Sequence, residues 1–242
     1  MPLIKLDAID STNDYLKQLA RKSELENYTI VLANEQTNGK GQMGAKWISE
    51  PGKNLIMSIL IKDIQLNNQN IFNLNIAISL SVAKVLFLMN IPNIKIKWPN
   101  DIMADSKKLA GILIENTIKP DGSINTVVGI GFNLNQTNFK NLPQATSLCC
   151  ITGVAYDIEE MALLFRESIK LYMKALAVDP KIQWELYDEM LYKKNRPSPF
   201  EDKQGKRFMG IIKKVTPDGK LEVQLEDDSI THFEVKEIKM LY

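Results

Sequence analysis

A glycine- and lysine-rich stretch, EQTNGKGQMGAKWISEPGKNL from Glu35 to Leu55, contains the residue types needed to bind an anion. Its glycines allow the backbone to approach a ligand and donate N–H groups, while Lys40 and Lys46 add positive charge. Trp47 offers a flat face on which a purine ring can stack. The same composition is also typical of an ordinary surface hairpin, so the loop alone leaves both interpretations open.

Two known phosphate-binding motifs can be compared with this loop. Residues 39–44 match the G-x-G-x-x-G pattern of dinucleotide-binding folds, but that pattern requires a helix to begin at the loop. The chain continues instead as AKWISEPGKN, in which Pro51 and Gly52 prevent a helix. A P-loop is also excluded, because Ala45 stands where a lysine must follow the second glycine.

A second group of polar residues surrounds two later predicted strands. Asn100 and Asp101, in KWPND, follow one strand, and Lys108 directly precedes the strand LAGILIE. Gly111 permits close approach of a ligand to that strand, and Asn133 follows a glycine-bearing strand in VVGIGFNLN. A solvated turn would explain any one of these residues, but it does not explain all of them in one chain.

Hydrophobic periodicity predicts the elements that position these residues. Helices are expected at 10–22 and 71–90, and two more between about 158 and 192. Strands are expected at 28–33, 54–61, 93–98, 108–117 and 125–135, the last two joined by the turn KPDGS. At NRPSPFEDKQGKR the composition changes, and short strands with turns at TPDGK and EDDS follow. We therefore predict an α+β fold with domains at 1–195 and 196–242, the second a barrel of about five strands.

Charge and composition exclude several classes of protein. The 30 basic and 29 acidic residues nearly cancel, which argues against bulk binding of DNA or of anionic membranes. The longest apolar stretch, 76–89, contains serines and a lysine and is not expected to span a membrane. Acidic residues near the start argue against a signal peptide.

The cysteine and histidine content indicates the cellular compartment and excludes two kinds of catalytic site. Cys149 and Cys150 are adjacent and unsuited to pairing, so we expect reduced, buried thiols in a cytoplasmic protein. His232 is the only histidine, which leaves little basis for a zinc site or a Ser-His-Asp triad.

Six motifs together resemble those of biotin protein ligases, the biotin–[acetyl-CoA-carboxylase] ligase family. They occur in the family's order and spacing: STN (11–13), EQTNGKGQMGAKW (35–47), KWPND (97–101), KKLAGILIE (107–115), GIGFN (129–133) and ATSL (145–148). The resemblance covers nearly the whole chain. It implies a mixed-sheet catalytic domain of the biotin/lipoate ligase type with a small C-terminal SH3-like β barrel. Ser11 lies so near the start that we expect the short form, without an N-terminal DNA-binding domain and without DNA binding.

The resemblance implies an ATP-dependent ligase that works in two steps. The carboxylate of biotin attacks the α-phosphate of ATP, which gives biotinyl-5′-AMP and pyrophosphate. A lysine of a biotin carboxyl carrier protein or domain then attacks the mixed anhydride. The first step needs no protein nucleophile, so the protein must stabilise charge and align the reactants. Mg²⁺ is expected as the cofactor, bound through the substrate phosphates and with protein ligands unknown.

Matched positions imply the site residues. The biotin site is expected to comprise Ser11, Thr12, Asn13, Gln36, Lys40, Gly41, Gln42, Lys108 and Gly111. The ATP and adenylate site is expected to comprise Lys40, Trp47, Asn100, Lys108 and Asn133. The catalytic residues would be Lys108 between carboxylate and α-phosphate, Lys40 facing them, and Asp101 orienting or deprotonating the incoming lysine. A turn-capping role is the alternative for Asp101. Leu109, Ile112 and Leu113 are candidates for the apolar wall, and strand alternation leaves open which of them face the pocket.

This chain departs from the family pattern in its glycine loop. The family commonly has G-R-G-R-x-G-R-x-W, whereas Lys40, Gln42 and Ala45 replace the three arginines here. An arginine expected near the C-terminal EVKEIKMLY is also absent.

Two other functions are alternatives to a biotin protein ligase. A lipoate–protein ligase shares the fold and the K-[LI]-x-G lysine but lacks KWPND, and a non-catalytic biotin- or nucleotide-binding module would not need the lost arginines.

Overall fold

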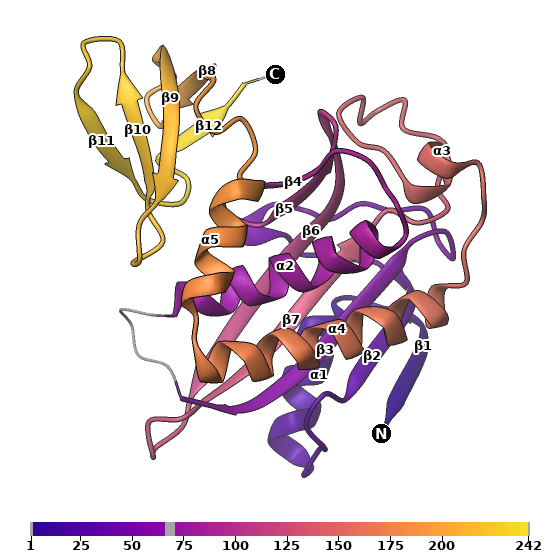
Figure 1. Cartoon of the computed structure of the whole chain (residues 1–242). Helices are drawn as coiled ribbons and strands as arrows, with labels where there is room; N and C mark the ends of the chain where they lie inside the picture. Colours follow the sequence, from indigo (N-terminus) through magenta and orange to yellow (C-terminus); the bar gives the residue numbers. More distant parts are fainter. Residues whose placement is uncertain (1, 66–70, 242) are drawn as a thin grey trace.

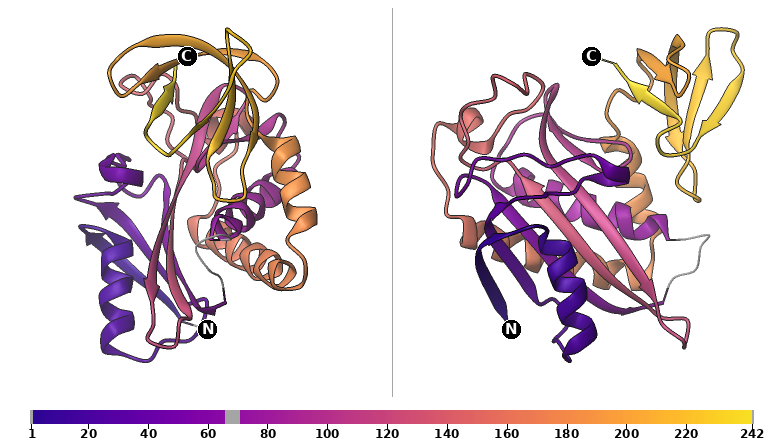
Figure 2. Two further views of the ribbon diagram at one scale, coloured as in Figure 1. Left: turned by 90° about the vertical axis from the view of Figure 1, so that its left-hand side faces the viewer. Right: turned by 180° about the vertical axis from the view of Figure 1, so that it is seen from behind.

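The computed structural model describes residues 2–65 and 71–241, which form a large mixed sheet covered by helices and a smaller second sheet (Figures 1 and 2). The large sheet has the strand order β1-β2-β3-β7-β6-β5-β4. Its strands are β1 (Leu3–Ile9), β2 (Ile30–Gln36), β3 (Leu55–Ile64), β4 (Ile94–Lys97), β5 (Asp101–Ala104), β6 (Lys107–Ile118) and β7 (Ile124–Phe132). The β1–β2 pair is parallel and the other pairs are antiparallel. The predicted α+β class with a mixed sheet is confirmed.

One helix, α1 (Thr12–Lys22), covers one face of this sheet (Figure 2). It begins at Ser11, whose hydroxyl accepts a hydrogen bond from the Asp14 N–H at 3.4 Å, as expected for an N-cap serine. Leu16 is fully buried and packs with Val31 and Leu60 of the sheet. This packing directs the first turn of α1, which carries the STN motif, towards the end of β2.

Three helices cover the opposite face: α2 (Phe72–Leu88), α4 (Ile158–Val178) and α5 (Lys181–Met190) (Figure 1). α2 is buried on most sides because it lies between the sheet and α4, where the Ser168 hydroxyl donates to the Ser81 carbonyl at 2.8 Å. The predicted helices in these regions are confirmed. Among the residues that the structure describes, no helix is both long and apolar enough to cross a membrane.

The second sheet follows α5 and is antiparallel throughout, with the order β11-β10-β9-β8-β12. Its strands are β8 (Pro197–Asp202), β9 (Arg207–Val215), β10 (Leu221–Leu225), β11 (Ile230–Phe233) and β12 (Ile238–Met240). This agrees with the five strands predicted and is consistent with an SH3-like barrel. The sheet contacts the larger part of the molecule at Trp98, whose indole N–H donates to the Gly219 carbonyl at 2.9 Å. The division at 195/196 remains a prediction.

Three elements were not predicted. β1 pairs in parallel with β2 at the sheet edge, β5 spans only four residues, and α3 (Leu148–Thr152) is a single short helix. The expectation that both cysteines are buried is wrong. The helix α3 buries its Ser147 cap and Leu148, so the next two residues turn away from the core, which leaves Cys149 partly exposed and Cys150 exposed.

Candidate active site

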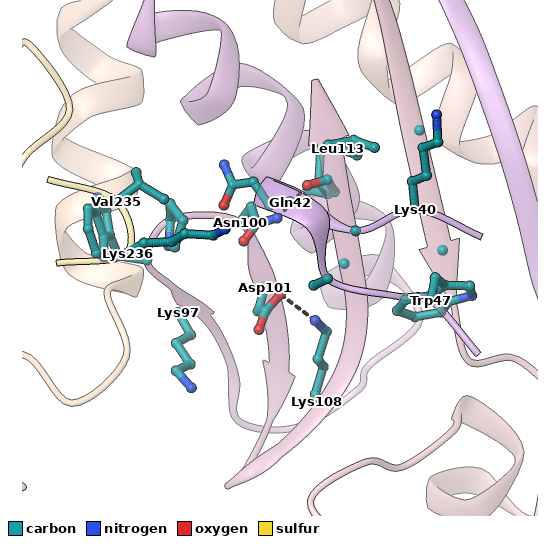
Figure 3. Close-up of a pocket in the computed structure, with 18 of the residues that line it drawn as sticks. Lys40, Gln42, Trp47, Lys97, Asn100, Asp101, Lys108, Leu113, Val235 and Lys236 are labelled. Carbon is teal, nitrogen blue, oxygen red and sulfur yellow. Dashed lines mark hydrogen bonds and ion pairs between the residues drawn. The ribbon is translucent and has the colours of Figure 1, made fainter. Parts of the chain in front are cut away.

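One cavity of about 580 Å³ lies between the large sheet, the glycine loop and the second sheet (Figure 3). It brings together residues from α1, the end of β2, the loop, the β4–β5 turn and β6. The predicted site residues that line it are Ser11, Thr12, Asn13, Gln36, Lys40, Gly41, Gln42, Trp47, Asn100, Asp101, Lys108 and Gly111. The two polar clusters that are separate in the sequence therefore line a single cavity.

A network of uncharged side chains forms one end of this cavity. The Gln36 amide oxygen accepts hydrogen bonds from the Thr12 N–H at 2.8 Å and from the Thr12 hydroxyl at 3.0 Å. The buried Ser58 hydroxyl lies 2.7 Å from the Thr12 hydroxyl and 2.5 Å from the Asn13 amide oxygen. Buried polar groups without charge favour a neutral polar ligand group, because a charged one would lose hydration without a counter-ion. Ser58 was not predicted; its only signal is a serine inside the apolar run of β3.

The glycines of β7 leave room for side chains above the strand. A Cβ on Gly129 would lie 2.5 Å from the Asn13 amide oxygen, and a Cβ on Gly131 would lie 2.4 Å from the Trp47 ring. Either substitution would force the side chain above it to move. The GIGFN motif thus provides a flat surface that supports the polar network at one position and the loop tryptophan at the other.

An ion pair between Lys108 and Asp101 occupies the middle of the site, with the Nζ–Oδ1 distance at 2.6 Å (Figure 3). The two residues lie on the neighbouring strands β6 and β5. The Lys108 backbone is fixed on its other side, since its N–H donates to the Gln144 carbonyl at 2.7 Å and its carbonyl accepts from the Thr146 N–H at 3.0 Å. The 144–146 segment, which overlaps the ATSL motif, therefore holds the lysine in place.

The glycine loop folds back as a narrow turn over the sheet. The Gly41 N–H donates to the Ala45 carbonyl at 2.6 Å, and the Trp47 N–H donates to the Gly39 carbonyl at 3.0 Å. Only a short 3₁₀ turn, η1 (Gln42–Gly44), follows the first glycines before strand β3. The prediction that residues 39–44 are not a dinucleotide-binding loop is confirmed, because no α-helix begins there.

Trp47 lies against the strand glycines rather than in solvent. The Lys108 ammonium is 5.8 Å from the centre of its ring, and its indole nitrogen is buried without a hydrogen-bond partner in the described part of the chain. One ring face is covered by Gly131, so an adenine ring could stack only on the opposite face.

Two predicted residues differ from the others in their placement. Asn133 does not line the cavity; it is buried, and its amide nitrogen lies 3.5 Å from the Lys108 carbonyl oxygen. Asn100 lines the cavity, but its amide nitrogen donates to the Ile112 carbonyl at 2.5 Å. Of the three candidates for an apolar wall, Ile112 and Leu113 line the cavity, whereas Leu109 is fully buried elsewhere.

The second sheet supplies lining residues that the sequence did not indicate, among them Val235, Lys236 and Lys239. Lys97 lines the same region. Burial lowers the pKa of Lys97 to about 8, with Lys108 and Lys239 acting in the same direction and Asp101 opposing them. This side of the cavity is therefore rich in positive charge.

Among the described residues, no group of three or more His, Cys, Asp or Glu side chains could hold a metal ion.

Comparison with solved structures identifies the class of protein that this fold and cavity define. The structure of the biotin protein ligase from Aquifex aeolicus in complex with biotin and ATP superposes with a TM-score of 0.79 and 26% identity, covering 99% of this chain and 98% of that one. The biotin protein ligase from Leishmania major, at 21% identity and a TM-score of 0.62, shows the same fold.

Sequence comparison agrees with this class. The bifunctional ligase/repressor BirA of Escherichia coli (strain K12) is 30% identical over 93% of this chain, and that of Bacillus spizizenii is 33% identical over 76%. This chain covers 69% and 59% of the lengths of these two relatives. The biotin/lipoate A/B protein ligase family matches residues 6–135. The chain belongs to this family.

Proposed function

We propose that the protein activates biotin with ATP to give biotinyl-5′-AMP and then transfers biotin to a lysine of a biotin carboxyl carrier protein. The observation that carries the proposal is the Lys108–Asp101 pair, which lies in one cavity with the glycine loop and the uncharged network around Thr12. An uncharged corner suits the ureido group of biotin, and a lysine-rich centre suits a carboxylate and a phosphate. The similarity to a ligase solved with biotin and ATP supports the same assignment.

In the first step, the biotin carboxylate oxygen bonds to the α-phosphorus of ATP and pyrophosphate leaves. Lys108 and Lys40 would stabilise the negative charge that develops there, and the Gly41 backbone would face the same atoms. Mg²⁺ would enter as part of the ATP substrate, bound to its phosphates. Trp47 would stack on adenine and Asn100 would help to fix the nucleotide. The buried position of Asn133 favours a role in supporting Lys108.

In the second step, the amine of the carrier lysine bonds to the biotinyl carbonyl carbon and AMP leaves. The amine must lose a proton before or during this attack. Asp101 is the carboxylate nearest to Lys108 in the cavity and would accept or orient that proton. Ser11, Thr12, Asn13, Gln36 and Gly111 would hold the biotin head and chain throughout. We also propose a cytoplasmic location, because both cysteines are free thiols.

The departures in the glycine loop lead to a prediction about Gln42. Lysine binds phosphate as a point charge, whereas arginine holds it through a planar fork, so this loop should retain the adenylate less tightly than an arginine-bearing loop. Gln42→Arg, alone or with Ala45→Arg, should slow the release of preformed biotinyl-AMP by about tenfold, the scale of one hydrogen bond to a charged group. Release is measured by rapid filtration or stopped flow. Unchanged or faster release in both variants would show that other residues already close the loop.

Pyrophosphate release distinguishes the proposed ligase from its two alternatives. The protein is incubated with ATP and Mg²⁺ and with biotin, lipoate or neither, and pyrophosphate is measured. We expect release that depends on biotin and exceeds that with lipoate. Equal pyrophosphate release with lipoate would support the lipoate ligase. No release above the control with either biotin or lipoate would support a binding module.

A further inference from the structure

The loop lysine is already paired with a carboxylate of the protein itself. The Lys40 ammonium forms an ion pair with Asp14, in the first turn of α1. Figure 3 shows that the Lys40 side chain consequently points away from the Lys108–Asp101 pair. A ligand anion that is to meet Lys40 must therefore compete with Asp14.

Asp14 is held in position from its other side. Lys17 lies 2.8 Å from the Asp14 carboxylate and 2.6 Å from that of Glu115, on β6. Glu115 in turn accepts a hydrogen bond from the Asn13 amide at 2.8 Å. Partial burial raises the pKa of Asp14, but the hydrogen bonds and charges of Lys17 and Lys40 outweigh it and lower that pKa overall. Alternating charges thus connect the glycine loop to the strand that carries Lys108.

We propose that Asp14 is a positioning residue that holds Lys40 and the glycine loop and yields Lys40 to the anionic group of the ligand. The anionic group is the carboxylate of biotin, and this part of the inference rests on the proposed function. Both side chains are partly exposed, at 30% for Asp14 and 45% for Lys40. Exposed ion pairs contribute little to stability, so a ligand anion can displace this one at small cost. Asp14 then sets the affinity and the rate at which the loop closes.

The test compares biotin with its uncharged methyl ester in Asp14→Asn. This variant keeps the shape of the side chain and removes its charge. Calorimetry should show biotin binding that is about two- to fivefold tighter, in line with the strength of an exposed pair, and unchanged binding of the ester. In a Lys40→Gln background, Asp14→Asn should have no effect on either ligand. Asp10→Asn, which removes a nearby carboxylate outside this chain of ion pairs, is the matched control.

A second measurement needs no ligand. The Gly41 and Trp47 amides close the loop turn, so their hydrogen exchange should become faster in Asp14→Asn and stay the same in Asp10→Asn. Equal changes for biotin and ester, an effect that persists in the Lys40→Gln background, or unchanged exchange of both amides would overturn the inference. If neither biotin nor its ester binds, the proposed function fails, and the exchange rates still decide whether Asp14 restrains the loop.

Discussion

Lys108→Ala should lower the rate of biotinyl-AMP formation by about a hundredfold or more, or ~3 kcal/mol, the scale of one lost donor at a developing negative charge. Lys108 is the residue expected to bridge the carboxylate and the α-phosphate, and its backbone is fixed by the 144–146 segment. The measurement is the burst of pyrophosphate with saturating biotin and ATP. The melting temperature should change little, because Lys108 lies at the surface of a cavity and not in the apolar core.

Lys107→Ala is the matched control for this experiment. Lys107 is the neighbouring residue on β6 and is exposed to solvent rather than lining the cavity. Its loss should leave pyrophosphate formation unchanged within a factor of about two, as expected for an exposed surface residue. Similar rates for the two variants would mean that the active lysine has been assigned wrongly.

Asp101→Asn should impair the transfer step more than the adenylation step. If the carboxylate accepts or orients the proton of the incoming amine, its loss should slow transfer from preformed biotinyl-AMP to the carrier by about a hundredfold or more. Adenylation should fall less, because Lys108 keeps its charge and only loses the partner at 2.6 Å. Single-turnover transfer from preformed adenylate separates the two steps.

Two controls show whether the Asp101 effect is chemical. Hydroxylamine is largely unprotonated at neutral pH, so its reaction with bound biotinyl-AMP should be nearly insensitive to Asp101→Asn. Asp105→Asn, on the turn after β5, removes an exposed carboxylate that accepts a hydrogen bond from Asn93 and should leave transfer unchanged. Equal losses with carrier lysine and hydroxylamine would assign Asp101 the structural role of holding Lys108.

The predicted residues that the structure brings together in one cavity belong to compact motifs at the ends of strands. The loop around Lys40, the KWPND turn and Lys108 could be recognised because each motif carries several specific residues within a few positions. Antiparallel pairing of β5 and β6 then brings two of these motifs together. The long helices were predictable as well, since their apolar patterns extend over many turns.

The residues that were missed acquire their position only through tertiary packing. Ser58 lies in an apolar strand, and nothing local distinguishes it from a buried core serine. The second sheet contributes Lys236 and Lys239 from more than a hundred residues beyond KWPND, a separation at which spacing carries no information. The partner of Lys40 could not be predicted either, because it depends on how the glycine loop folds back over α1. Strand β1 lies at the edge of the sheet and pairs with β2 only across the intervening helix.

The most direct test of the proposed function is the modification of a carrier protein. The chain is incubated with ATP, Mg²⁺, biotin and the unmodified carrier domain of a biotin-dependent carboxylase, and the carrier is analysed by intact mass and peptide mapping. We predict one biotin on a single lysine, no modification when that lysine is replaced by arginine, and none when lipoate replaces biotin. A carrier that stays unmodified with biotin, or that is modified equally well with lipoate, would contradict the proposed function.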